Sequence, residues 1–222
     1  MNFSGHDLTC IRGERIVFQD LSFSLGSGDA LVLRGPNGCG KSTLLRLAAG
    51  FLQAASGELA WRDTGDRDGQ GPDDHNHDHD DDYHDRIHYV GHLDGVKAAF
   101  SVVENLAFWA VFDGSESVEA DCTRALDQVG LGHIADIPGR YLSAGQRRRL
   151  NIARIAATSR PLWLLDEPSV SLDDASVDLL AKLIAVHRAG GGMVMVATHI
   201  DLDMAGAETL RFTANTDPAG KS

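Results

Sequence analysis

Short apolar runs alternate along the chain with longer segments in which apolar residues recur at helical spacing. The short runs predict buried strands, and these lie at residues 30–34, 58–61, 86–90, 162–165 and 193–197. The periodic segments predict helices, and these lie at residues 42–49, 101–108, 118–129, 143–159 and 174–188. Strands that alternate with helices are typical of a mainly parallel sheet with helices on both faces. The pattern therefore predicts an α/β fold.

The length of 222 residues suits one domain with a substantial core. We expect this domain to cover residues 1–215, followed by a tail at residues 216–222. Residues 98–160 read as mostly helical, so we expect a helical subdomain beside the sheet.

The net charge of −12 changes the range of possible partners. Binding to nucleic acid needs a basic face, so the composition argues against it. The three cysteines, Cys10, Cys39 and Cys122, fit no metal-site spacing and are expected to be reduced. No apolar run approaches the roughly 20 residues of a membrane helix, and the start of the chain does not resemble a signal peptide. If the protein acts at a membrane, we therefore expect it to bind at the surface through partner proteins.

Much of the negative charge lies in one insertion, at residues 63–86, where ten Asp accompany Arg67 and Arg86. Such a composition cannot form a core, so we expect a flexible loop. Its histidines suggest weak binding of zinc or nickel, through His75, His77, His79 and His84. The alternative is a solvated loop without a role.

A phosphate-binding loop is predicted between the first buried strand and the helix that follows it. Residues 35–42 match G-x-x-x-x-G-K-[ST], in the strand-to-helix context that the motif requires. Backbone N–H groups of such a loop surround phosphates, and the helix N-terminus favours their charge. We expect Lys41 to reach the β- and γ-phosphates and Ser42 to bind Mg²⁺. The full set of expected ATP contacts here is Gly35, Pro36, Asn37, Gly38, Cys39, Gly40, Lys41, Ser42 and Thr43.

Two acids end the apolar run at residues 162–165. Carboxylates at the carboxyl end of a parallel strand, beside a phosphate loop, can serve a nucleotide. We expect Asp166 to hold Mg²⁺, directly or through water, and Glu167 to orient and deprotonate the attacking water. A purely structural corner would leave this pair unexplained.

Further motifs resemble those of the nucleotide-binding domains of ABC transporters. Leu142-Ser-Ala-Gly-Gln146 resembles the family signature, Ser171-Leu-Asp173 the D-loop, and His199 the switch histidine. The resemblance implies a P-loop ATPase fold with an antiparallel β subdomain and a helical subdomain. It also implies a head-to-tail dimer that holds ATP between residues 35–42 of one copy and the signature of the other. The resemblance therefore adds Ser143, Ala144, Gly145, Gln146, Asp173 and His199 to the ATP site.

Two departures from the family pattern point to a subfamily. Cys10 is the expected replacement for the aromatic residue that stacks on adenine, and His92 replaces the Q-loop glutamine. These residues, with residues 142–150, resemble the ATP-binding subunit of bacterial cytochrome c maturation, a haem exporter system. That resemblance implies an ATPase peripheral to the cytoplasmic face of the membrane, with integral membrane subunits and a haem-handling complex as partners. His92 is then expected beside Glu167 and His199 in catalysis.

Other functions stay open at this point. Another ABC exporter or importer would carry the same motifs. A soluble ABC-type switch is a third possibility, although such proteins usually have two fused nucleotide domains or basic arms. A P-loop kinase or GTPase would leave residues 142–146 unexplained.

Overall fold

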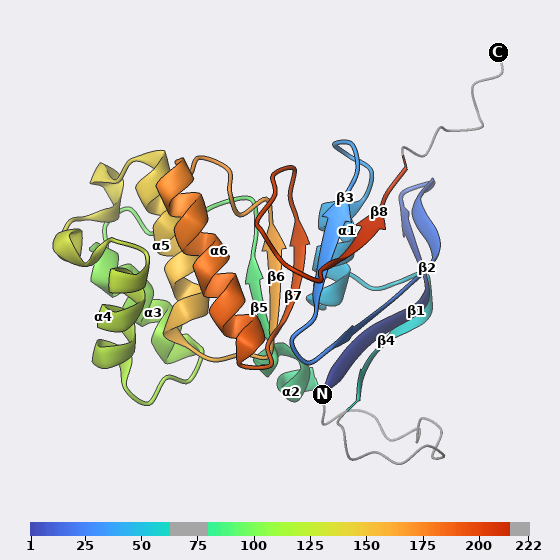
Figure 1. Cartoon of the computed structure of the whole chain (residues 1–222), viewed down its shortest axis with the longest axis horizontal. Helices are drawn as coiled ribbons and strands as arrows, with labels where there is room; N and C mark the ends of the chain where they lie inside the picture. Colours follow the sequence, from blue (N-terminus) through green and yellow to red (C-terminus); the bar gives the residue numbers. More distant parts are fainter. Residues whose placement is uncertain (63–79, 214–222) are drawn as a thin grey trace.

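A parallel sheet forms the centre of the computed structural model, which describes residues 1–62 and 80–213 (Figure 1). Its strand order is β5-β6-β7-β3-β8. The strands are β3 (Ala30–Arg34), β5 (Ile87–Val90), β6 (Leu162–Asp166), β7 (Met193–Ala197) and β8 (Glu208–Arg211). Every residue of β6 and β7 is buried, as expected for central strands covered on both faces.

Helices cover both faces of this sheet. Side chains alternate along β7, so that Val194 and Val196 pack in one core with α6 (Asp174–Ala189), while Met193 and Met195 face the other core. That second core contains the leucines of α1 (Lys41–Ala48). The central strands therefore fix the position of α1, and with it the end of the phosphate loop.

An antiparallel sheet lies at one end of the molecule, next to α1 (Figure 1). Its order is β2-β1-β4, formed by β1 (Asn2–Arg12), β2 (Arg15–Gly26) and β4 (Ser56–Arg62). Phe3 of β1 packs against the rings of Phe23 and Trp61 and shares the core of α1. The antiparallel sheet and the central sheet are thus joined through one hydrophobic core.

Three helices gather at the opposite end (Figure 1). They are α3 (Val102–Phe112), α4 (Val118–Gln128) and α5 (Ala144–Ala157), with 3₁₀ turns at Gly132–Ile134 and Gly139–Tyr141. A capping box formed by Ser101 and Glu104 begins α3. In the described parts of the chain, no helix is both long and apolar enough to span a membrane.

The expectation of a flexible loop over residues 63–86 is wrong at its C-terminal end. Helix α2 (Asp80–Asp85) forms there. Tyr83 anchors it by donating a hydrogen bond to the Ala48 carbonyl at 2.7 Å, and Arg160 donates to the His84 carbonyl. These residues show no apolar periodicity in the sequence, and the helix is held by the contacts of Tyr83 and Arg160.

Most of the suggested metal site lies outside the described residues, because His75, His77 and His79 fall between residues 63 and 79. His84 is exposed and belongs to α2. Among the described residues, no group of three or more His, Cys, Asp or Glu side chains could hold a metal ion. The hypothesis therefore gains no support from the described part of the insertion.

Candidate functional site

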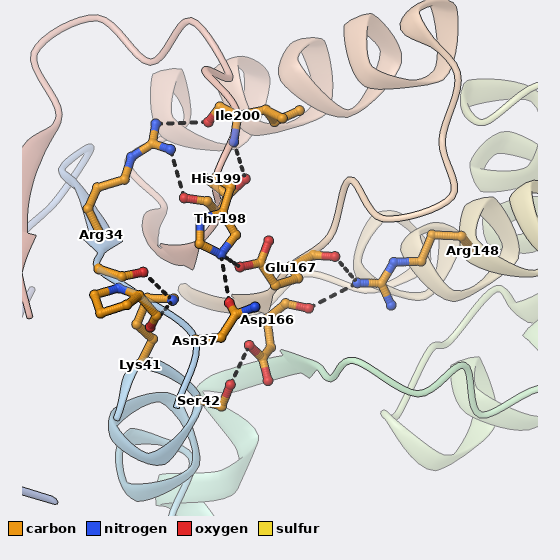
Figure 2. A network of polar contacts seen from close by, with 12 residues as sticks. Arg34, Asn37, Lys41, Ser42, Arg148, Asp166, Glu167, Thr198, His199 and Ile200 are labelled. Carbon is orange, nitrogen blue, oxygen red and sulfur yellow. Dashed lines mark hydrogen bonds and ion pairs between the residues drawn. The ribbon is translucent and has the colours of Figure 1, made fainter. Parts of the chain in front are cut away.

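The phosphate loop folds tightly between β3 and α1. Gly40 caps the helix with φ at 113°, and a Cβ at this position would lie 2.8 Å from Val17 of β2. Glycine is therefore required both for the backbone conformation and for the space. Lys41 is buried, and its ammonium donates to the carbonyls of Gly35 at 2.7 Å and Pro36 at 3.1 Å (Figure 2).

The two residues expected to hold Mg²⁺ lie next to each other. Ser42 Oγ, in the first turn of α1, donates a hydrogen bond to Asp166 Oδ1 at 2.8 Å (Figure 2). Asp166 ends β6 and is only 2% exposed. Both groups present oxygen atoms, the ligands that Mg²⁺ prefers, so the donor set fits this ion.

Glu167 turns out of the sheet immediately after Asp166. Its φ is 48°, a left-handed conformation that is uncommon for a residue with a side chain. Its backbone N–H donates to the Ala197 carbonyl at 2.8 Å. Its carboxylate Oε1 lies 3.1 Å from His199 Nε2, which is also 3.2 Å from Asn37 Oδ1 (Figure 2). The phosphate loop, the end of β6 and the loop after β7 therefore meet at one point.

A cavity of about 430 Å³ opens where these segments meet. Its lining includes Lys41, Ser42, Glu167, His199 and His92. Four more residues that were predicted to contact ATP also line the cavity, namely Asn37, Gly38, Gly40 and Thr43. The predicted His92 thus lies beside the catalytic candidates, although it comes from the segment that follows β5.

Three predicted residues of the phosphate loop do not line this cavity. Gly35 and Pro36 contribute the carbonyls that accept from Lys41. Cys39 is buried, and a Cβ on Gly35 would lie 2.9 Å from its sulfur. These three residues therefore contribute to the packing and hydrogen bonding within the loop.

The signature residues lie outside the cavity of their own chain. Ser143 caps α5 by accepting from the Gln146 N–H at 3.2 Å, and the Gln146 side chain accepts from the Ser143 N–H at 2.8 Å. Ser143 and Ala144 remain exposed. Asp173 caps α6 by accepting from the Ser176 N–H at 2.9 Å. A single chain therefore does not bring Ser143, Ala144, Gly145, Gln146 or Asp173 to its own nucleotide cavity.

The structure places Cys10, the expected replacement for the adenine-stacking aromatic residue, in the hydrophobic core. Cys10 is 2% exposed and packs in the core with Phe18 and Leu8, and burial raises the pKa of its thiol. A side chain held in this core cannot contact a base. Leu8 lies two residues earlier on the same face of β1, so the alternation of the strand could have indicated burial.

Sequence reasoning missed the arginines that hold the site. Arg34 donates to the carbonyls of Thr198 at 2.7 Å and Ile200 at 2.8 Å, on either side of His199 (Figure 2). Arg148, on α5, reaches the backbone of Asp166 and Glu167. A charged residue at the end of a buried strand was a signal for Arg34. For Arg148 the only signal was its place in the run of residues 147–149.

Comparisons with known proteins identify the family and the fold of this chain. Residues 18–170 match the family described as ABC transporter. A solved ABC transporter ATP-binding protein from Pyrococcus furiosus superimposes with a TM-score of 0.78 at 21% identity, covering 96% of this chain and 98% of that one. The ADP conformation of another ATP-binding cassette gives 0.72 at 24% identity, covering 91% and 83%. The fold and the site define an ATP-binding cassette, the ATP-hydrolysing class of P-loop protein.

Relatives with much higher identity narrow the class. The Cytochrome c biogenesis ATP-binding export protein CcmA of Rhodospirillum rubrum is 50% identical over 94% of this chain and 84% of its own length. The protein of the same name from Paramagnetospirillum magneticum is 49% identical over 95% of this chain and 93% of its own. The chain belongs to the CcmA family of ABC transporter ATP-binding proteins. The expected resemblance and fold class are thereby confirmed.

Proposed function

We propose that this chain binds and hydrolyses MgATP at the cavity between the phosphate loop and the end of β6. The observation that carries the proposal is the convergence of Lys41, the Ser42–Asp166 pair and the Glu167–His199 pair around one cavity. No other arrangement in the described residues combines a phosphate loop with acids of this kind.

Ser42 and Asp166 are the residues that would hold Mg²⁺. The ion would neutralise phosphate charge in the transition state. Lys41 contributes a second positive charge at the phosphates, and the backbone N–H groups of residues 38–42 contribute hydrogen bonds. Charge neutralisation and positioning account for most of the catalysis in phosphoryl transfer, so these groups carry the binding part of the mechanism.

Glu167 orients the attacking water and accepts its proton. Its position, 3.1 Å from His199 Nε2, lets the imidazole orient the carboxylate and contact the γ-phosphate. His92 lines the same cavity, where its imidazole would contact the water shell of a bound Mg²⁺. We assign Glu167, His199 and His92 to catalysis on this basis.

A second copy of the chain completes the site. Ser143 and Ala144 are exposed at the N-terminus of α5, where a helix end favours an anion. We propose a head-to-tail dimer in which residues 143–146 and Asp173 of one copy cover the nucleotide held by residues 35–43 of the other. Hydrolysis then removes the bridging γ-phosphate and weakens the interface.

A groove beside the nucleotide cavity suits a membrane partner. It has a volume of about 1160 Å³ and is lined by residues of β5, α3 and α5. Leu93 and Phe112 on its rim are 85% and 74% exposed. Arg154 also lines the groove, whereas the charge of Arg160 is paired with Asp85 and Asp113. His92 lines both this groove and the nucleotide cavity. We propose that integral membrane subunits dock here, with the chain peripheral on the cytoplasmic face.

The names of the relatives support a role in cytochrome c biogenesis, as the ATPase of a haem-handling export complex. In this role residues 1–215 act as one ATPase domain and residues 98–160 as the helical subdomain that meets the membrane subunits. An alternative is the ATPase of another ABC transporter.

Steady-state hydrolysis by Glu167→Gln tests the ATPase proposal. The amide keeps the size of the side chain but cannot accept the proton of water, so we expect the rate to fall by about 100-fold or more while MgATP still binds. Binding is followed with a fluorescent ATP analogue, and Lys41→Ala is the comparison that loses binding. Hydrolysis at the wild-type rate in Glu167→Gln would remove the assignment of Glu167.

Affinity purification from membranes tests the proposed partners. We expect integral membrane subunits of a cytochrome c biogenesis system to accompany the wild-type chain. The double variant Leu93→Ser, Phe112→Ser should lose them, because it removes two exposed apolar side chains from the rim of the groove. Co-purification of an unrelated permease would favour the alternative, and full retention by the double variant would exclude this groove.

A further inference from the structure

Arg148 is a buried cation that joins three separate segments of the molecule. It lies in the second turn of α5, and its side chain is 2% exposed. Its guanidinium makes five hydrogen bonds, which use all five N–H donors of the group. The acceptors are Pro168 O at 3.0 Å, Asp166 O at 3.0 Å, Glu167 O at 2.7 Å, Gly91 O at 2.8 Å and Asp94 Oδ1 at 3.2 Å.

This set of contacts explains how a full charge is tolerated in the interior. A buried cation is costly unless it is paired and every donor is satisfied. Asp94 supplies the compensating charge, and Asn151 also donates to the same carboxylate oxygen at 3.4 Å. The planar fork of arginine matches acceptors on several sides, which a lysine ammonium with three donors cannot do.

One side of the guanidinium holds the turn that carries the catalytic carboxylate. Here the guanidinium donates hydrogen bonds to three successive backbone carbonyls, those of Asp166, Glu167 and Pro168 (Figure 2 shows the first two). Glu167 has a φ of 48°, and such a conformation persists only where its surroundings impose it. The three contacts supply that restraint and so fix the direction of the Glu167 side chain.

The other side of the guanidinium holds the segment that follows β5. Gly91 and Asp94 lie on either side of His92, and Gly91 lines the docking groove. His92 lines both the groove and the nucleotide cavity. A displacement of this segment therefore pulls on the same rigid group that holds Glu167.

We propose that Arg148 is a positioning residue that sets the orientation of Glu167 and links it to the segment at residues 91–94. Arg148 contacts neither the phosphate loop nor the cavity, so it acts on the chemical step through Glu167 and leaves ATP binding largely unchanged. The inference rests on the proposed role of Glu167 as base. In this proposal, Arg148 transmits movements of the segment beside the groove to the carboxylate that takes part in hydrolysis.

Purified full-length Arg148→Lys tests the proposal. We expect kcat to fall by about tenfold or more with KM for ATP within about twofold, because a small misplacement of a catalytic group can cost that much. Hydrogen–deuterium exchange should rise in peptides that cover residues 166–170 and 91–94, and stay unchanged in residues 35–43. Arg149→Lys is the matched control, since Arg149 is the next residue and donates to the carbonyls of Val129 and Gly130, away from the site. It should keep the wild-type kcat.

A wild-type kcat in Arg148→Lys would overturn the proposal, and so would an equal loss in Arg149→Lys. If Arg148→Lys does not fold, Asp94→Asn gives the decision, because its side chain is partly exposed and the change removes only the charge of the pair. A lower kcat at unchanged KM supports the link, and an unchanged kcat overturns it. Inactive Glu167→Gln together with fully active Arg148→Lys would reject this inference alone and leave the proposed function standing.

Discussion

At the scale of single residues, the site depends on a few contacts between side chains far apart in the sequence. The Ser42–Asp166 contact joins α1 to β6 across 124 positions. Asp166 is almost fully buried, so its charge needs a partner at this place. Both the hydroxyl of Ser42 and a bound cation can provide one. A substitution in this pair should therefore change the affinity for Mg²⁺.

Ser42→Ala removes this hydroxyl. We expect the gain in ATP affinity that Mg²⁺ provides to fall by about tenfold, because one of the two oxygen ligands is lost. ATP affinity is measured with Mg²⁺ and again with EDTA, and the EDTA value should match wild type. Lys41→Ala should lose affinity under both conditions. An undiminished effect of Mg²⁺ in Ser42→Ala would contradict the assignment.

Residues in short motifs could be predicted from the sequence because local spacing carries their chemistry. Lys41, Ser42, Asp166 and Glu167 meet as expected, since a strand-to-helix loop and a strand end each place them locally. Arg148 could not be assigned in this way. Its role follows from five acceptors on two segments, residues 91–94 and 166–168, and neither segment is near it in sequence.

At the scale of elements, the start of α5 packs tightly against the loop before α6. A Cβ on Gly145 would lie 2.9 Å from the Ser171 carbonyl, and Ser171 has a φ of 67°. Both helices are capped at this point, by Ser143 and Asp173. The signature and the D-loop therefore form one packed unit on the surface.

Gly145→Ala forces this unit apart, because the methyl group meets backbone rather than a flexible side chain. We expect a loss of about 1–3 kcal/mol in the free energy of unfolding. ATP hydrolysis should also fall, since the signature surface shifts. Ala144→Gly is the control, because Ala144 is exposed and the change adds no atoms. Denaturant unfolding and steady-state hydrolysis give the two values, and wild-type behaviour of Gly145→Ala would show that the contact is relaxed without cost.

Elements with a strong pattern could be predicted, and elements without one could not. The central strands agree with their apolar runs, and α3 agrees with its helical periodicity. The edge strand β8 went unpredicted because it is mostly exposed and offers no apolar run. Helix α2 went unpredicted because it is made of acidic residues and depends on Tyr83.

At the scale of the whole molecule, the signature residues of one chain lie outside its own nucleotide cavity. The nucleotide cavity lies between the phosphate loop and the end of β6, while Ser143 and Ala144 are exposed at the start of α5. The order of motifs was enough to predict the fold class, because each motif needs its own strand or helix. The proposed pairing of copies rests on the exposure of the signature together with the position of the cavity.

The molar mass of Glu167→Gln in solution, measured by light scattering after size exclusion, tests this central claim most directly. The variant holds ATP without hydrolysing it, so a closed pair should persist. We predict the mass of one chain without nucleotide and twice that mass with MgATP, and the doubling should disappear when Lys41→Ala is added. A protein that binds MgATP at saturation and keeps the mass of a single chain would contradict the account.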